Sequence, residues 1–94
     1  MTHALSGQKA VTTAGTALPL GTQVIDAPML VKALTTNTGL VYVGNDGAMD
    51  VTSANGYPLA AGDQVIFEHV SSLKQVIVDS AVNGEGVAWL ALET

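Results

Sequence analysis

The apolar and polar positions of this chain form short runs separated by turn residues, and this pattern predicts a protein built from β-strands. Runs of about four to eight residues that are rich in Val, Ile, Thr and aromatic residues and bounded by Gly, Pro, Asn and Asp are typical of strands. The predicted strands are Gln8–Thr13, Thr22–Ile25, Met29–Thr36, Leu40–Gly44, a possible short edge strand at Val51–Ser53, Gln64–Val70, Gln75–Asp79 and Val87–Leu92.

The segments between these runs carry clear turn signals. Asn45-Asp46-Gly47 predicts a tight turn because these residue types tolerate positive φ, and Asn83–Gly86 predicts a hairpin-type loop. Asn55–Asp63 reads as one long turn segment, and Asp26-Ala27-Pro28 is expected to end the extended piece before it. The only helical structure expected is about one turn near Ser71–Leu73.

Met29–Thr36 is the ambiguous run. Its Met, Leu, Ala and Lys residues favour a helix, but the run lies between Pro28 and Asn37 and therefore has the length of a strand. We interpret it as a strand.

The last predicted strand is apolar on both of its faces. Two sets of apolar residues alternate and point in opposite directions: Val87, Trp89 and Ala91 on one face, and Ala88, Leu90 and Leu92 on the other. A strand of this kind lies in the centre of a fold, or a neighbouring subunit covers it.

Together these strands predict an all-β protein. About seven or eight short antiparallel strands at regular spacing fit a single small β-sandwich or a jelly-roll-like barrel. The chain length favours one domain. We divide it into an N-terminal arm with a possible first strand over residues 1–13 and a β-sandwich domain over residues 14–94.

The composition points to an unusually neutral surface. Charged residues make up 12% of the chain, against about 25% in typical domains, which suggests that neighbours cover much of the surface. Three basic residues and a net charge of −5 argue against nucleic acid and against an anionic membrane as partners. The absence of cysteine excludes disulfide and thiolate chemistry. We see neither a signal peptide nor a run long enough to span a membrane, and we expect a soluble protein synthesised in a cytoplasm.

Four stretches carry a family resemblance: Val41–Asn45, Val51–Asp63, Leu73–Ser80 and Gly84–Val87. In order and spacing they resemble small β-sandwich virion proteins of tailed bacteriophages, over about Val31–Leu92. The resemblance implies a capsid decoration (cement) protein that stabilises the head through non-covalent contacts with the major capsid protein or other virion proteins. It also implies a homotrimer on the capsid surface of the virion, made in the host bacterial cytoplasm. The alternative is a tail, baseplate or head-fibre module that contacts host surface glycans.

The sequence carries few residues or motifs typical of enzymes, and we expect neither catalysis nor a cofactor. No G-x-S-x-G elbow and no phosphate-binding loop occurs. His3 and His69 are the only histidines, so a cupin-type metal site at His69 is a weaker hypothesis than a partly exposed strand residue. Asn45–Asp50 could offer oxygens to calcium but lacks the ligand spacing of an EF-hand. We therefore expect no metal.

The candidate interface residues come from three regions and from the last strand. The regions are the N-terminal segment Thr2–Thr13, the loop Asn45–Asp50 and the loop Asn55–Asp63. Deletion of the first dozen residues is expected to weaken attachment and to leave the fold intact. Phe67 and Trp89 are expected in the core, although Trp89 is also an interface candidate because of the apolar last strand. The candidates are Thr2, His3, Leu5, Asn45, Asp46, Tyr57, Pro58 and Trp89.

Overall fold

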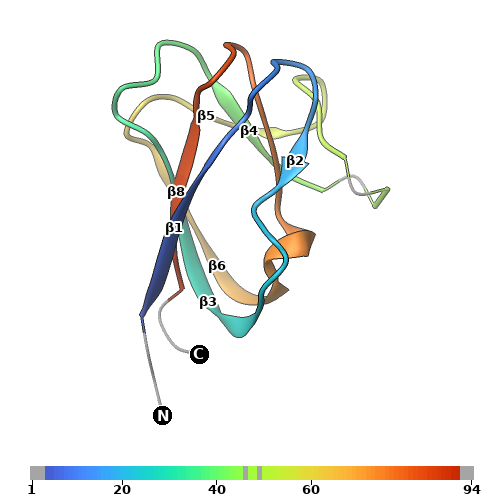
Figure 1. Cartoon of the computed structure of the whole chain (residues 1–94), viewed down its shortest axis with the longest axis vertical. Helices are drawn as coiled ribbons and strands as arrows, with labels where there is room; N and C mark the ends of the chain where they lie inside the picture. Colours follow the sequence, from blue (N-terminus) through green and yellow to red (C-terminus); the bar gives the residue numbers. More distant parts are fainter. Residues whose placement is uncertain (1–3, 46, 49, 92–94) are drawn as a thin grey trace.

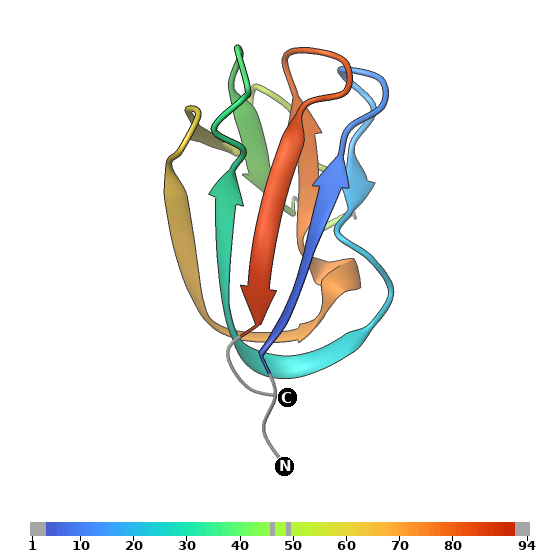
Figure 2. The same ribbon diagram turned by 60° about the vertical axis from the view of Figure 1, so that its left-hand side comes forward.

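The protein is a β-sandwich of two four-stranded antiparallel sheets (Figures 1 and 2), which confirms the all-β prediction. The structure is a computed structural model that describes residues 4–45, 47–48 and 50–91. The first sheet has the strand order β1-β8-β3-β6, and the second has the order β2-β7-β4-β5. The elements are β1 Leu5–Ala10, β2 Leu18–Pro19, β3 Val24–Ala33, β4 Val41–Gly44, β5 Tyr57–Leu59, β6 Gln64–Ser72, the 3-10 helix η1 Leu73–Gln75, β7 Ile77–Ser80 and β8 Gly86–Ala91.

The apolar last strand, β8, lies inside the first sheet. It pairs with β1 on one side, from Leu5↔Ala91 to Ala10↔Gly86, and with β3 on the other. Val87, Trp89 and Ala91 are buried against the second sheet, whereas Ala88 and Leu90 are half-buried on the opposite face. The prediction of a central strand is therefore confirmed. One of its apolar faces lies in the core, and the other lies on the opposite, half-buried side of the sheet.

Strand β3 runs straight through the segment that was expected to end it. Its pairing with β6 shifts register between Val24 and Ala27 and again between Ala27 and Met29. Pro28 lies at the second irregularity, where a missing N–H costs the ladder least, and Asp26 adopts φ 49° beside the first. The expectation that Asp26-Ala27-Pro28 ends the extended segment was wrong, because β-bulges accommodate these residues within one long strand.

Two other predictions about local structure need correction. Tyr57–Leu59 forms an edge strand, β5, inside the stretch that was read as a long turn, and it pairs with β4 through Val43↔Tyr57 and Val41↔Leu59. Val51–Ser53 forms no strand. Val51 is nevertheless buried, so the apolar signal there reflects a loop residue that packs into the fold.

The N-terminal segment contributes a regular strand. Leu5–Ala10 forms β1, which begins before the predicted Gln8 and pairs along its whole length with β8. Val11 directly after it is fully buried. Deletion of the first dozen residues would therefore remove a strand and a core residue, and it cannot serve as a test that leaves the fold intact.

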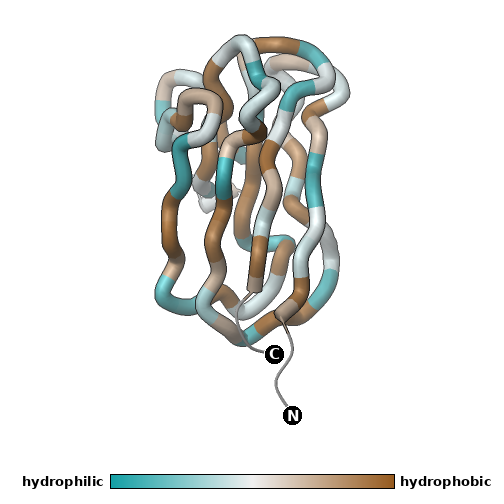
Figure 3. Tube along the Cα trace, turned by 90° about the vertical axis from the view of Figure 1, so that its left-hand side faces the viewer, coloured by the Kyte–Doolittle hydropathy of each residue, from teal (hydrophilic) through white to brown (hydrophobic). Residues whose placement is uncertain are grey.

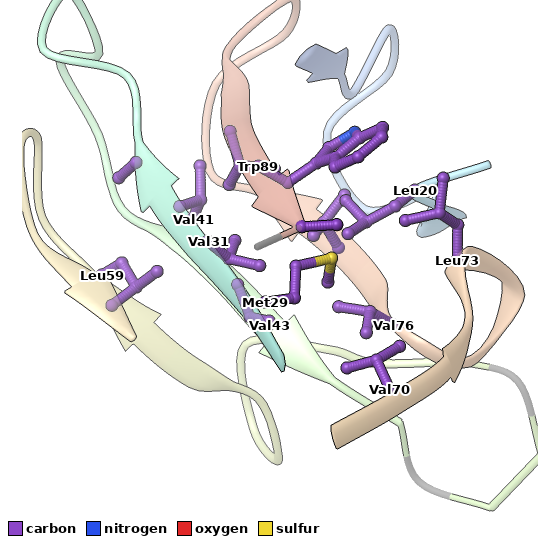
Figure 4. Close-up of a cluster of buried hydrophobic side chains, with 14 of the residues drawn as sticks. Leu20, Met29, Val31, Val41, Val43, Leu59, Val70, Leu73, Val76 and Trp89 are labelled. Carbon is purple, nitrogen blue, oxygen red and sulfur yellow. The ribbon is translucent and has the colours of Figure 1, made fainter. Parts of the chain in front are cut away.

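The core lies between the two sheets and consists of aliphatic side chains with one methionine and one tryptophan (Figure 4). Met29, Val31, Val41, Val78 and Val87 are essentially inaccessible to solvent. Burial of each side chain of this size stabilises the fold by roughly 1.5–3 kcal/mol. Trp89 is 9% exposed and belongs to the core, as predicted. Phe67 is partly buried and packs against this core cluster.

A small polar network ties the loops together at the end of the sandwich where β8 begins. The buried Asn37 side chain donates from Nδ2 to the carbonyl of Gly86 (2.8 Å) and accepts from the Gly86 N–H at its Oδ1 (3.4 Å). The Leu34 N–H donates to the same Gly86 carbonyl. The loop after β3 is thus bonded to the start of β8, and the buried amide is satisfied.

Candidate interaction surface

The side of the first sheet that faces away from the core forms a broad surface, which we call the outer face. The strand register places Ser6, Leu90, Leu30 and Ile66 in one row across the four strands. Side chains alternate between the two sides of a strand, and the neighbours of these residues, such as Val31 and Trp89, point into the core. The row therefore projects outward.

The middle of the outer face is apolar. Ile66 is 62% exposed, while Leu30, Leu90 and Ala88 are half-buried. Figure 3 looks onto this sheet and shows hydrophobic stretches at mid-height on neighbouring strands. Leu30, Ala88 and Leu90 line a shallow hollow of about 310 Å³. We call Leu30, Ile66, Ala88 and Leu90 the apolar band.

Charges flank the row of Leu90, Leu30 and Ile66 on both sides. Lys32, which pairs with Gln64 and Ala88, is one outward position toward the end where β8 begins. Glu68 and His69 lie toward the other end, opposite Pro28 in the irregular part of the β3–β6 pairing. His69 Nε2 is 3.6 Å from Asp26 Oδ1, and both side chains are well exposed. The prediction of His69 as a partly exposed strand residue is confirmed.

A second exposed surface lies at the β5 edge of the second sheet. Here the structure brings together three residues that were predicted from two separate loops. Tyr57 is 61% exposed, and Pro58 and Asn45 are exposed beside it, because Tyr57 pairs with Val43 two residues before Asn45. The Asn45 side chain donates to the Gln75 carbonyl (3.4 Å) and accepts from the Gly47 N–H (2.8 Å). We call Asn45, Tyr57 and Pro58 the β5 edge.

The other predicted interface residues lie elsewhere. Leu5 is half-buried on β1 and packs against the core, and Trp89 is buried, so neither side chain presents a free surface in a single copy. Thr2, His3 and Asp46 lie outside the described residues.

Asp79 is the buried carboxylate among the described residues, and its side chain accepts hydrogen bonds from the backbone of two segments. Its Oδ1 accepts from the Gly15 N–H (3.0 Å) and from the Ser80 N–H (2.8 Å). The side chain lies on the outer side of the second sheet, opposite Tyr42. These bonds fasten the loop between β1 and β2 to strand β7.

Leu30 and Ile66 are the surface residues that sequence reasoning missed. Each lies inside an unbroken apolar run, Met29-Leu30-Val31 and Val65-Ile66-Phe67. A strict alternation would place a polar residue at the middle position, so an apolar residue there is the signal of a second apolar face. The same signal was recognised in the last strand at Leu90.

The described residues contain no group of three or more His, Cys, Asp or Glu side chains arranged to hold a metal ion. No helix within the described part of the chain is long and apolar enough to cross a membrane. Comparisons with protein-family models, with curated proteins and with solved structures found no match for this chain.

Proposed function

We propose that this chain is a bacteriophage virion structural protein, a capsid decoration protein that stabilises the head through non-covalent contacts with the major capsid protein. The observation that carries the proposal is the β5 edge, where an exposed tyrosine, a proline and an asparagine lie close together on a low-charge sandwich. Tyrosine is among the residues that contribute most to protein interfaces, because it buries a large area at a small cost in conformational entropy. The resemblance to small virion proteins of tailed phages supports the same assignment.

The physical requirements of such a protein agree with this fold. A capsid repeats one binding site many times, so a modest contact per site can stabilise the whole shell, and binding to several linked sites strengthens it further. A neutral contact surface avoids the desolvation of charges on binding. A sandwich with one continuous core transmits strain between the capsid subunits that it bridges, because packed interiors have low compressibility.

The test uses particles of the phage whose genome encodes this chain. Mass spectrometry of purified particles is expected to detect the chain in the head. Particles made without it are expected to release DNA at a lower temperature, and the purified chain is expected to restore the release temperature when it is added back. Absence of the chain from particles, or equal heat stability of particles made without it, would contradict the proposal.

Two variants locate the contact. Tyr57→Ser removes the aromatic ring from the β5 edge and is expected to reduce binding to particles. Val24→Ser is the matched control, because Val24 is 68% exposed on the other sheet. Equal loss in both variants would argue against the β5 edge.

A second candidate function is a tail, baseplate or head-fibre module that binds host surface glycans. The same exposed Tyr57 ring favours it, since aromatic rings offer a face on which a sugar can stack. Glycan-array binding that disappears in Tyr57→Ala, together with location of the chain in the tail, would support this alternative. The homotrimer stays a prediction of the resemblance.

A further inference from the structure

We propose that the outer face of the first sheet binds the outer face of a second copy of this chain, which forms a two-fold, face-to-face dimer. The apolar band leaves Ile66 well exposed on the edge strand β6, beside the hollow lined by Leu30, Ala88 and Leu90. Contiguous exposed apolar patches on soluble proteins often mark interaction sites. The placement of charges around the band identifies a second copy as the occupant.

The register defines how two copies would meet. Leu90, Leu30 and Ile66 lie in one row that runs across the strands. A two-fold axis along this row places the row of one copy on the row of the other and reverses the strand direction between them. Sheets that pack face to face keep their strands within about 30° of parallel or antiparallel alignment, so this arrangement fits the usual geometry.

The charges around the row match under the same rotation. Lys32 lies one outward position to one side of the row, and Glu68 lies one outward position to the other side. Because successive outward residues are about 6.8 Å apart along a strand, the axis brings Lys32 of each copy over the end of the partner that carries Glu68. Two reciprocal pairs form, as an isologous interface requires. Asp26, at the same end as Glu68, adds to the attraction.

The negative net charge of the chain explains why the position of Lys32 on the outer face matters for association. Two copies with a charge of −5 each repel one another unless opposite charges meet at the contact. The chain has three basic residues, and the other two are placed differently. Lys9 is half-buried on the inner side of β1, and Lys74 lies in η1. Lys32 is therefore the basic residue that the outer face offers to a partner.

The two edges of the first sheet are less suited than its outer face to pairing with another copy. At the β1 edge, Lys9 points toward the core side, and a charge in that position obstructs an added strand. At the β6 edge, the register irregularities around Glu68 bend the strand. Natural proteins use both features to prevent edge-to-edge pairing, which leaves the outer face for association.

The experiment is sedimentation equilibrium of the purified chain from about 10 µM to about 1 mM, because contacts that bury less than roughly 1,200 Å² in total are weak. We expect a monomer–dimer equilibrium. Ile66→Thr keeps a β-branched residue but removes apolar contact, and it is expected to raise the dissociation constant at least about tenfold.

Charge reversal tests the orientation of the two copies. Lys32→Glu and Glu68→Lys are each expected to weaken the dimer about tenfold, and the double variant is expected to recover most of the affinity, since it restores both pairs in reverse. Lys74→Glu is the matched control: like Lys32→Glu, it changes the net charge from −5 to −7, but it lies outside the outer face. Circular dichroism of each variant checks that the fold is kept.

Several results would overturn the proposal. They are a monomer at the highest concentration, a trimer, an equal effect of Lys74→Glu and Lys32→Glu, and a double variant that is as weak as the single ones. The assay contains no virion and leaves Tyr57 unchanged, so failure of the dimer would not contradict the role of the β5 edge, and a trimer would overturn the dimer in favour of the assembly that the resemblance implies.

Discussion

At the scale of single residues, the carboxylate of Glu85 is held by three hydrogen bonds. Its Oε2 accepts from the Thr38 N–H (2.7 Å) and from the Thr38 hydroxyl (2.9 Å), and its Oε1 accepts from the Gly39 N–H (3.0 Å). The backbone N–H groups of Gly39 and Thr38 lower the pKa of Glu85 below its ordinary value of 4.5, because they stabilise the ionised form. This carboxylate joins the loop before β4 to the loop before β8.

The lowered pKa predicts a pH dependence of stability. Because the folded-state pKa lies below the unfolded-state value, the ionised Glu85 stabilises the fold above pH 4.5, and this contribution is lost as the pH falls through the folded-state pKa. Urea unfolding of the wild type and of Glu85→Gln at several pH values between 7 and 3 measures it. The variant is expected to be less stable at pH 7, and the difference is expected to shrink in acid.

A second carboxylate provides the control for that experiment. Glu68→Gln removes the same charge from the exposed end of the outer face, away from the Thr38 and Gly39 backbone. At concentrations low enough to keep the chain monomeric, its effect on stability is expected to be small at every pH. A constant difference between Glu85→Gln and wild type from pH 7 to acid would show that these hydrogen bonds do not depend on the charge.

At the scale of elements, the pairing of β1 with β8 depends on a glycine under a tryptophan. Gly7 pairs with Trp89 across the two strands. A Cβ atom on Gly7 would lie 2.7 Å from Cζ2 and 2.9 Å from Cε2 of the indole ring, closer than real contacts allow. The ring thus covers the position where a side chain at residue 7 would stand, and the edge strand can lie close against β8.

Gly7→Ala is therefore expected to destabilise the protein. Either the indole or β1 must move, and overpacking of this kind costs about 1–3 kcal/mol in the free energy of unfolding. The chain has one tryptophan, so the fluorescence of Trp89 reports the change directly during chemical unfolding. Ser6→Ala on the outward side of the same strand is the control and is expected to stay within about 0.5 kcal/mol of wild type. Equal stability of both variants would show that β1 shifts without cost.

The elements also show what the sequence could predict. Strands with a clear apolar pattern and flanking turns, such as β4, β6 and β8, were found close to their observed bounds. The passage of β3 through Pro28 and the short strand β5 were missed. Whether a proline fits in a strand depends on the register with a partner: Pro28 lies at a bulge against β6, and Pro58 lies in an edge strand.

The candidate surfaces were predictable to a different extent. Asn45, Tyr57 and Pro58 were selected one by one from turn chemistry and aromatic character, but the β4–β5 register that unites them is a tertiary property. The outer face could be foreseen at Leu90, where two apolar faces alternate. At Leu30 and Ile66, the same run of apolar residues fits a fully buried strand equally well, and only the edge position of β6 shows that Ile66 is exposed.

At the scale of the whole molecule, the charges are few and unevenly divided between the two signs. Charged residues account for 12% of the sequence, and acidic residues exceed basic ones by eight to three. Repulsion between copies therefore comes from a small surplus of carboxylates. That surplus disappears as they are protonated, and proteins near zero net charge associate and precipitate.

We accordingly expect a minimum of solubility near pH 4.4, the isoelectric point of the sequence. Light scattering across a pH series measures it, with circular dichroism on the same samples to distinguish association of the folded chain from acid unfolding. Lys74→Glu adds negative charge and is expected to move the minimum to lower pH. A minimum at the same pH in both proteins would mean that charge does not control solubility here.

The pairing of Leu5 with Ala91 has a consequence for how this fold can be combined with other proteins. The first described strand begins beside the end of the last one, and paired residues of antiparallel strands have Cα atoms only about 4.5–5.5 Å apart. A domain that the chain enters and leaves at neighbouring points can be spliced into a surface loop of a host protein without forcing the ends of that loop apart. The sandwich from Leu5 to Ala91 is thus suited to serve as an inserted, self-contained module, with the β5 edge and the outer face carried along as two separate sides.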